Sequence, residues 1–168
     1  MKIRQGGLAD VPAILDMLDG AVAWLAAQGR TGQWGTEPWS TRPEAVRRVR
    51  DIVASGTPWV AEVDGKPAGT LTLSAHPAPY VAPADEPERY VHLLVTDRAF
   101  RGLGVGSALL AHAVAETRRE GVGLLRVDCY AGDDQRLVAY YRSQGFTPTE
   151  TFTVGEWPGQ VLAQRVTP

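Results

Sequence analysis

The chain has 168 residues, of which 44% are hydrophobic and 21% charged, and its net charge is −2. This length suits one domain with a single core, and the near-neutral charge gives no reason to expect a nucleic-acid partner. The single cysteine, Cys129, excludes an internal disulfide. The sequence shows neither a signal-peptide pattern nor an apolar stretch long enough to span a membrane, so we expect a cytoplasmic protein without membrane contact.

The first predicted elements are a short strand at Ile3 and a helix that begins after Asp10. Asp10 is a favourable N-cap, and Pro12 fits the first helical turn because a missing N–H costs nothing there. An apolar stripe at helical spacing marks the buried face, and Gly29 ends the helix. The stripe consists of Ile14, Leu15, Leu18, Val22 and Leu25.

Residues 30–40 are predicted to form a loop that carries Trp34 and Trp39. The segment Thr41–Glu44 then has the pattern of a capping box with a proline inside the start. It predicts a second helix that continues to Ser55.

A predicted hairpin follows, with strands at Pro58–Val63 and Lys66–Ser74 joined by the two-residue turn Asp64–Gly65. The next segment, His76–Pro87, holds four prolines and has no periodicity. A loop of that length in a compact domain is typically functional or mobile.

The most informative stretch is Val91–Arg119, in which a strand leads into a glycine-rich turn and then a helix. Val91–Val95 is short and apolar, Arg101–Gly106 contains three alternate glycines, and a helical pattern runs from Ser107 until Gly121 stops it. Glycines let the backbone approach a ligand closely, and the first helical turn presents N–H groups at the positive end of the helix dipole. The stretch therefore predicts an anion site, with a pyrophosphate as the expected ligand.

The rest of the chain supplies another apolar strand at Leu124–Tyr130 and a helix at Asp134–Ser143. A closing hairpin is expected from Phe152–Val154 and Gln160–Val166. The predicted order is β-α-α-β-β-β-α-β-α-β-β.

The spacing of the glycine turn separates it from two common phosphate motifs. No lysine follows Gly106, as a P-loop requires, and Gly102-x-Gly104-x-Gly106 differs from the Gly-x-Gly-x-x-Gly dinucleotide fingerprint. The pattern Arg101-x-x-Gly104-x-Gly106 resembles the acetyl-CoA signature of the GCN5-related N-acetyltransferase (GNAT) superfamily. The alternative is a tight strand-to-helix turn that binds no ligand.

A second motif near the C-terminus carries the same resemblance. Asp134, followed seven residues later by Tyr141 and then by Gly145-Phe146, is similar to the family motif, with Asp134 in the place of the usual asparagine. The predicted order of elements also matches the family. The resemblance implies one N-acetyltransferase domain over residues 1–168. It further implies an α/β fold with a central mixed, mostly antiparallel twisted sheet, flanked by helices and containing a splayed parallel strand pair.

The resemblance implies acetyl-CoA as the cofactor. In the family the pantetheine arm lies along the central strand, here Leu93, Leu94 and Val95, where a bulge frees an N–H near the acetyl carbonyl. Asp134 would stand at a further cofactor contact. The pyrophosphate would lie on the main chain of Arg101, Gly102, Leu103, Gly104, Val105, Gly106 and Ser107.

Tyr141 aligns with the general acid of the family, which protonates the departing thiolate of CoA; the alternative is that it only packs its helix against the sheet. His92, whose imidazole titrates near neutral pH, is a candidate base, acting directly or through water. A hydrogen-bonded core histidine is the other interpretation of His92, and Glu88, Asp128 or a water chain are alternative proton acceptors.

The acceptor side is expected to involve aromatic residues from the loops, namely Trp34, Trp39, Tyr80 and Trp157. Aromatic rings can hold an apolar group or a cation, although loop tryptophans can also serve only to pin a loop. Together with the resemblance, these residues lead us to expect an acetyl-CoA-dependent N-acetyltransferase whose acceptor is a primary amine on a small molecule. The amine would attack the acetyl group directly in a ternary complex.

Three alternatives stay open from the sequence: a CoA-binding sensor without turnover, acetylation of protein N-termini or lysines, and a nucleotide-binding protein with an unusual phosphate loop. No metal site is predicted, and the oligomeric state is left open, a homodimer included.

Overall fold

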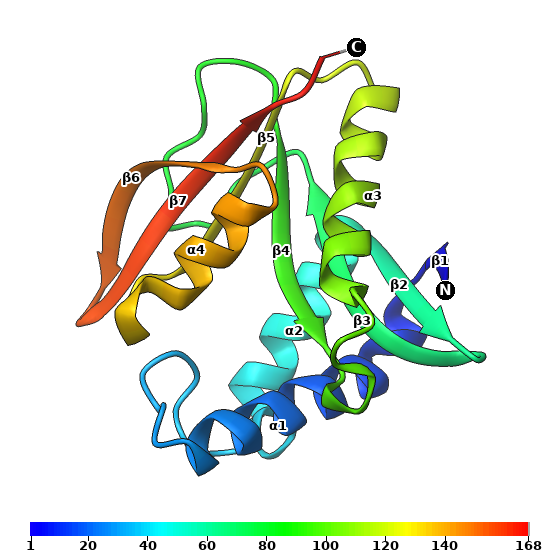
Figure 1. Ribbon diagram of the computed structural model, residues 1–168, viewed down its shortest axis with the longest axis vertical. Coiled ribbons are helices and arrows are strands. Elements are labelled where there is room, and N and C mark those ends of the chain that lie inside the picture. Colours follow the sequence, from blue (N-terminus) through cyan, green and yellow to red (C-terminus); the bar gives the residue numbers. More distant parts are fainter. Residues whose placement is uncertain (168) are drawn as a thin grey trace. The chain divides into compact units, whose positions relative to one another are not determined.

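The computed structural model describes residues 1–167 (Figure 1). Within them the chain forms seven strands and four α-helices, together with four short 3-10 helices. The strands are β1 (Lys2–Gln5), β2 (Thr57–Val63), β3 (Lys66–Ser74), β4 (Arg89–Thr96), β5 (Leu124–Tyr130), β6 (Thr147–Val154) and β7 (Trp157–Arg165). The α-helices are α1 (Val11–Ala27), α2 (Pro43–Ser55), α3 (Val105–Arg119) and α4 (Arg136–Ser143). Among the described residues, no helix has the length and apolar character that a membrane span requires.

The strands form one sheet in the order β1-β2-β3-β4-β5-β7-β6. The β1–β2, β2–β3, β5–β7 and β6–β7 pairs are antiparallel. β4 and β5 are parallel, with Arg89–Val91 opposite Leu125–Val127. The predicted mixed, mostly antiparallel sheet flanked by helices is therefore confirmed.

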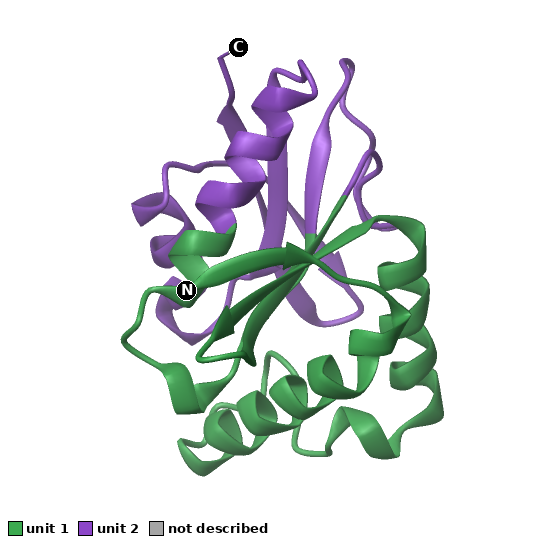
Figure 2. Cartoon of the chain, turned by 90° about the vertical axis from the view of Figure 1, so that its right-hand side faces the viewer, with its two compact units in different colours: residues 1–73, 92–109 green, residues 74–91, 110–168 purple. Residues whose placement is uncertain are grey.

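The chain divides into two compact units, which Figure 2 shows in different colours. Unit 1 comprises Met1–Leu73 and His92–Leu109, and unit 2 comprises Ser74–Val91 and the chain from Leu110 onward. The unit boundaries fall inside β4 and α3, so each unit contains part of both elements. A single acetyltransferase domain over residues 1–168 stays a prediction.

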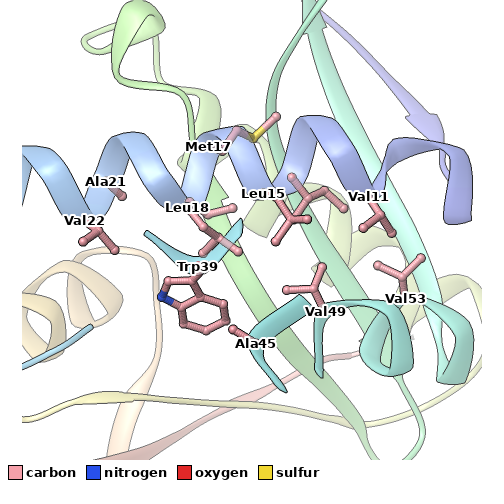
Figure 3. Packing of buried hydrophobic residues seen from close by; sticks show 12 residues of the cluster. Val11, Leu15, Met17, Leu18, Ala21, Val22, Trp39, Ala45, Val49 and Val53 are labelled. Carbon is pink, nitrogen blue, oxygen red and sulfur yellow. The ribbon is translucent and has the colours of Figure 1, made fainter. Parts of the chain in front are cut away.

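The core of unit 1 lies between α1 and α2 (Figure 3). Leu18 on α1 and Val49 on α2 are completely buried, and the ring of Trp39 packs beside them. The predicted apolar stripe of α1 thus faces α2, and Gly29 follows the helix in the left-handed conformation that suits a helix end.

Neither predicted helix cap in unit 1 makes a capping hydrogen bond to its α-helix. Asp10 occupies the predicted N-cap position of α1, but its carboxylate accepts a hydrogen bond from the Gly7 N–H at 3.0 Å and pairs with Arg4 at 2.8 Å. The prediction for α2 was wrong in position as well, because its N-cap is Arg42. Thr41 lies in a 3-10 turn (Trp39–Thr41), where its hydroxyl donates to the Pro38 carbonyl at 2.9 Å. In both cases the side chain interacts with a nearby group outside the helix and does not accept a hydrogen bond from the N–H groups at the helix start, as the local pattern predicts.

In unit 2, β5 separates two different environments by simple alternation of its side chains. Leu125, Val127 and Cys129 share one face of the strand, while Arg126, Asp128 and Tyr130 share the other. A small core of Val81, Tyr90 and Val161, with Phe152 packed against it, belongs to the second face, because Val161 is the direct partner of Asp128.

Candidate active site

The central strand β4 contains an irregularity at Leu93. This residue has a φ of 55° in the left-handed region, which is uncommon for a residue other than glycine and costs on the order of 1–3 kcal/mol. The parallel pairing with β5 extends only as far as Val91, two residues earlier, whereas β5 pairs with β7 as far as Tyr130. The backbone of β4 therefore changes course at Leu93, in the segment expected to receive the pantetheine arm.

The start of the turn after β4 is held in place by contacts within unit 1. The Asp97 N–H donates to the Ala68 carbonyl on β3 at 2.8 Å, and the Asp97 side chain accepts from the Ala99 N–H at 2.8 Å. The guanidinium of Arg98 lies 3.7 Å from the ring centroid of Trp24 on α1, close enough for a cation–π interaction. These contacts fix the start of the glycine turn against α1 and β3.

The glycine turn leads directly into α3, which begins at Val105, two residues before the predicted Ser107. Gly102 and Gly104 have φ values of 81° and 72°, and a Cβ at either position would meet nothing within 4 Å. At the start of α3 the Ala108 N–H donates to the Gly104 carbonyl at 3.0 Å. The main-chain N–H groups of residues 105–107 precede that bond, as expected for the first turn of a helix.

We call Arg101–Ser107 the phosphate cradle. Its backbone combines two glycines that adopt left-handed conformations, open space beside them and amides at a helix start. Those are the features by which a backbone binds a pyrophosphate without a lysine. The residues of the cradle therefore fit the diphosphate of acetyl-CoA.

Tyr141 lies on α4 in unit 2 and is buried, with 6% of its surface exposed. Its ring packs edge-on against Phe146 at 5.9 Å and against Tyr140 at 5.4 Å between centroids. Burial, followed by nearby Cys129, Tyr140 and Asp128, raises the pKa of Tyr141 above its usual value. The hydroxyl therefore stays protonated at neutral pH and is able to donate a proton.

The same surroundings affect Cys129, whose pKa burial and then Asp128 raise to about 12. The thiol is therefore neutral and unreactive at physiological pH. It contributes packing on β5 and does not act as a nucleophile.

Asp134 lies before α4 in a run of three left-handed residues. Asp133, Asp134 and Gln135 have φ values of 54°, 59° and 58°. Aspartate tolerates this conformation better than most residues, because its short polar side chain can hydrogen-bond locally. The Asp134 side chain is exposed on this turn.

The candidate bases occupy different environments. His92 is half-buried in the unit 1 part of β4, next to Leu93. Glu88 is 5% exposed and accepts hydrogen bonds from Arg126 at 2.7 and 2.9 Å and from the Ala84 N–H at 2.8 Å. This carboxylate is committed to a buried ion pair, which is a structural role.

Asp128 differs from Glu88 because two tyrosine hydroxyls approach its carboxylate. Tyr90 donates to Asp128 Oδ2 at 2.6 Å, and Tyr80 approaches Asp128 Oδ1 at 3.5 Å. Burial and then the charge of Asp128 raise the pKa of Tyr90, so that Tyr90 remains a donor. The sequence named Asp128 only as one alternative base, and Tyr90 was not singled out.

The four predicted acceptor residues fall into two groups. Trp39 is 6% exposed in the core of unit 1, with Arg42 and Arg48 within 5.6 and 5.9 Å of its ring, while Trp34 packs edge-on beside it at 6.1 Å. Their environment favours the interpretation of Trp39 as a residue that pins its loop. Tyr80 and Trp157 belong to unit 2, where they meet two rings that the sequence analysis did not select, Phe152 and Tyr130.

The predicted site residues are thus distributed between the units. Unit 1 contains His92, the strand segment Leu93–Val95, the phosphate cradle and both loop tryptophans. Unit 2 contains Tyr80, Asp134, Tyr141 and Trp157.

A mixed sheet with one short parallel pair, an irregular central strand and a glycine turn at a helix start are the features expected of a transferase that uses acyl-CoA. The chain belongs to the acetyltransferase (GNAT) family, whose model matches residues 21–146. It is an N-acetyltransferase, and acetyl-CoA is its cofactor. No curated protein matches the sequence.

Solved structures of acetyltransferases share the fold along almost the whole chain. The ribosomal-protein-alanine N-acetyltransferase of Brucella melitensis is 24% identical, with 98% of this chain and 99% of that chain covered and a TM-score of 0.64. Salmonella typhimurium yncA, solved with its cofactor acetyl-CoA, is 18% identical over 100% of this chain and 95% of that one, with a TM-score of 0.66. Aminoglycoside 6'-acetyltransferase type Ii is 13% identical over 100% and 99% of the two chains, also with a TM-score of 0.66. At these identities the likeness shows the fold alone.

Proposed function

We propose that this N-acetyltransferase acetylates a primary amine on a small molecule, by direct attack of the amine in a ternary complex with acetyl-CoA. The observation that carries the proposal is a cluster of aromatic side chains in unit 2 that keeps solvent-accessible surface. Tyr80, a member of this cluster, is 39% exposed. Such rings suit the apolar flanks of a small amine. The fold alone does not determine the class of acceptor, since the similar structures include enzymes named for a ribosomal-protein alanine and for an aminoglycoside.

The cofactor residues have distinct tasks in this proposal. The amides of the phosphate cradle hold the diphosphate, and the main chain of Leu93–Val95 pairs with the amide groups of the pantetheine arm. The irregular backbone at Leu93 supports a role for this segment in placing an N–H near the acetyl carbonyl, where one such donor typically contributes ~3 kcal/mol. When bound, acetyl-CoA supplies the acetyl thioester that the amine attacks.

Two side chains carry out proton transfers in the proposed reaction. His92 accepts a proton from the acceptor ammonium, directly or through water, so that the amine nitrogen has a free electron pair. Tyr141 donates its hydroxyl proton to the sulfur of CoA as the C–S bond breaks. The raised pKa of Tyr141 keeps its hydroxyl protonated at the start of each turnover, as a proton donor must be.

The proposed function is tested by measuring release of the CoA thiol from acetyl-CoA with a panel of acceptors. The panel contains primary alkylamines, 2-phenylethylamine, an aminoglycoside and a short peptide with an N-terminal alanine. We expect kcat/KM for at least one small amine to exceed that for the peptide by about tenfold, a difference of ~1.4 kcal/mol in transition-state binding. A peptide that reacts faster than every small amine would instead establish a protein acceptor.

A further inference from the structure

One face of the unit 2 strands carries a row of aromatic rings. Tyr130 on β5 and Phe152 on β6 are both register partners of Gly159 on β7, so the glycine lies between them. A Cβ at Gly159 would fall 2.2 Å from the ring of Phe152. The ring of Phe152 therefore lies directly on the backbone of Gly159, in space that a side chain at position 159 would occupy.

The rings follow one another at contact distance. Tyr80 and Phe152 are 5.0 Å apart between centroids and tilted by 30°, Phe152 and Trp157 are 6.2 Å apart at 35°, and Trp157 and Tyr130 are 5.3 Å apart at 42°. We call Tyr80, Phe152, Trp157 and Tyr130 the aromatic row. Tyr80 is exposed and the other three are half-buried, so the row retains surface that a planar ligand can cover.

A carboxylate adjoins this row. Asp128 precedes Tyr130 by two residues and shares its face of β5, and the Tyr80 hydroxyl lies 3.5 Å from Asp128 Oδ1. Tyr80 thus belongs to the row and also approaches the carboxylate. The ring of Tyr90 is completely buried, and its hydroxyl donates a hydrogen bond to Asp128 Oδ2 at 2.6 Å. This bond fixes the orientation of that second carboxylate oxygen.

Arg126, on the same face of β5, is paired with acids. It bonds Glu88 at 2.7 Å and lies 3.5 Å from Glu150. This face of unit 2 presents aromatic surface and, next to it, the Asp128 carboxylate, to which the Tyr90 hydroxyl donates.

We propose that the aromatic row and Asp128 together form the acceptor subsite, and that the acceptor is an ammonium carried on a flat apolar body, as in an arylalkylamine. The apolar body lies on the rings, and the ammonium donates to Asp128. This assignment rests on the proposed function for the chemistry that follows binding. Asp128 is a binding and positioning residue, because it holds the nitrogen before the proton is removed.

Calorimetric titration of the full chain in the presence of CoA tests the subsite without turnover. The probes are 2-phenylethylamine, 2-phenylethanol and n-propylamine, which carry the ring with the charge, the ring alone and the charge alone. We expect 2-phenylethylamine to bind about tenfold more tightly than either other probe, because it alone makes both the ring contact and the charge-assisted hydrogen bond. Equal affinities for the three probes, or no binding of any, would overturn the proposal.

Variants separate the two parts of the subsite. Asp128→Asn should weaken 2-phenylethylamine about tenfold and leave 2-phenylethanol unchanged, since only the ammonium needs the charge. Trp157→Leu should weaken both ring-bearing probes. Asp51→Asn makes the same chemical change at an exposed position on α2 in unit 1 and should alter neither affinity. If Asp128→Asn weakens both ring-bearing probes equally, the carboxylate only supports the packing of the rings and the proposal fails.

Thiol release distinguishes this inference from the proposed function. Selective binding of 2-phenylethylamine, with no amine in the panel causing release of the CoA thiol from acetyl-CoA, would support the subsite and contradict the proposed function. Equal kcat/KM for n-propylamine and 2-phenylethylamine would support a small-molecule acetyltransferase and overturn the subsite.

Discussion

Tyr90 donates a hydrogen bond from its hydroxyl to Asp128 Oδ2 over 2.6 Å, although its ring is completely buried. A buried phenol needs such a partner, and a charged acceptor makes the bond short and strong. The two residues come from the paired strands β4 and β5, where Tyr90 faces Arg126 in the register. The hydrogen bond therefore ties the orientation of Asp128 to the parallel strand pair.

Tyr90→Phe keeps the ring and removes only this donor. We expect affinity for 2-phenylethylamine to fall about three- to tenfold and the free energy of unfolding to fall by roughly 1–3 kcal/mol, the usual range for a hydrogen bond to a charged group. Calorimetry and urea denaturation measure the two effects. Tyr80→Phe is the matched control, and it should have less effect on stability because a 3.5 Å approach is at the limit of hydrogen bonding. Equal losses of stability in both variants would show that the short bond has no special role.

Gly104→Val tests the phosphate cradle. Its side chain would enter the open space where the diphosphate is expected and would also force a φ of 72° on a β-branched residue. We expect the Kd for acetyl-CoA to rise by about tenfold or more, as loss of several backbone hydrogen bonds to an anion implies. Gly65→Val controls for strain, because Gly65 has a similar φ of 76° and open surroundings in the β2–β3 turn. An equal loss of affinity in both variants would exclude a local contact at residue 104.

Tyr141→Phe tests the general acid. Turnover should fall ~100-fold while the Kd for acetyl-CoA changes little, because the variant removes a proton donor and keeps the buried ring. The raised pKa keeps the native hydroxyl protonated, so the deficit should be the same at about pH 7 and about pH 9, below the ordinary tyrosine pKa. Tyr140→Phe removes the neighbouring hydroxyl and should stay within about twofold of the native rate, well below the usual acid–base contribution. A Tyr141→Phe enzyme with the native rate would make Tyr141 a packing residue.

Arg126→Met tests the buried ion pair with Glu88, whose side chains are 7% and 4% exposed. Removal of the guanidinium leaves a buried carboxylate without its cation and also removes the hydrogen bond to the Ala82 carbonyl at 2.9 Å. We expect a loss of about 3–5 kcal/mol in the free energy of unfolding, measured by urea denaturation. The double variant Arg126→Met with Glu88→Leu should recover most of the loss, since it leaves no buried charge. A double variant no more stable than Arg126→Met alone would contradict this explanation.

The glycine turn before α3 and the strand β5 were predictable because their signals are local; phosphate binding by the turn stays a prediction. Glycines, the start of a helical pattern and a short, largely apolar run are all contained in short windows, and β5 has the predicted bounds Leu124–Tyr130. The closing hairpin was predicted too short. β6 begins at Thr147 and is exposed along most of its length, so it shows little of the alternation that marks a half-buried strand.

Other features depend on partners distant in the sequence. The left-handed conformation of Leu93 has no signal in its own residue type, because leucine adopts it only where the surrounding structure compels it. Tyr90 and Asp128 are 38 residues apart, and their contact requires the β4–β5 register. The Asp10 carboxylate pairs with Arg4 and does not bond the N–H groups at the start of α1, and the capping pattern alone does not predict this ion pair.

Trp34 and Trp39 were predicted together as walls of the acceptor pocket, and the structure gives them different expected effects. Trp39 is 6% exposed in the core between α1 and α2, so Trp39→Ala should cost about 3–5 kcal/mol of stability and lower Tm by roughly 10 °C. Trp34 is half-buried and packs on the same core as Leu93, the irregular residue of β4. The sequence-based expectation that Trp34 contacts the acceptor is a separate one, and it predicts that Trp34→Ala raises the acceptor KM about fivefold, a typical loss for one aromatic contact, with Tm nearly unchanged. Thermal unfolding and thiol-release kinetics on both variants measure these effects. A Trp34→Ala enzyme with native kinetics and a Tm as low as that of Trp39→Ala would make both rings structural.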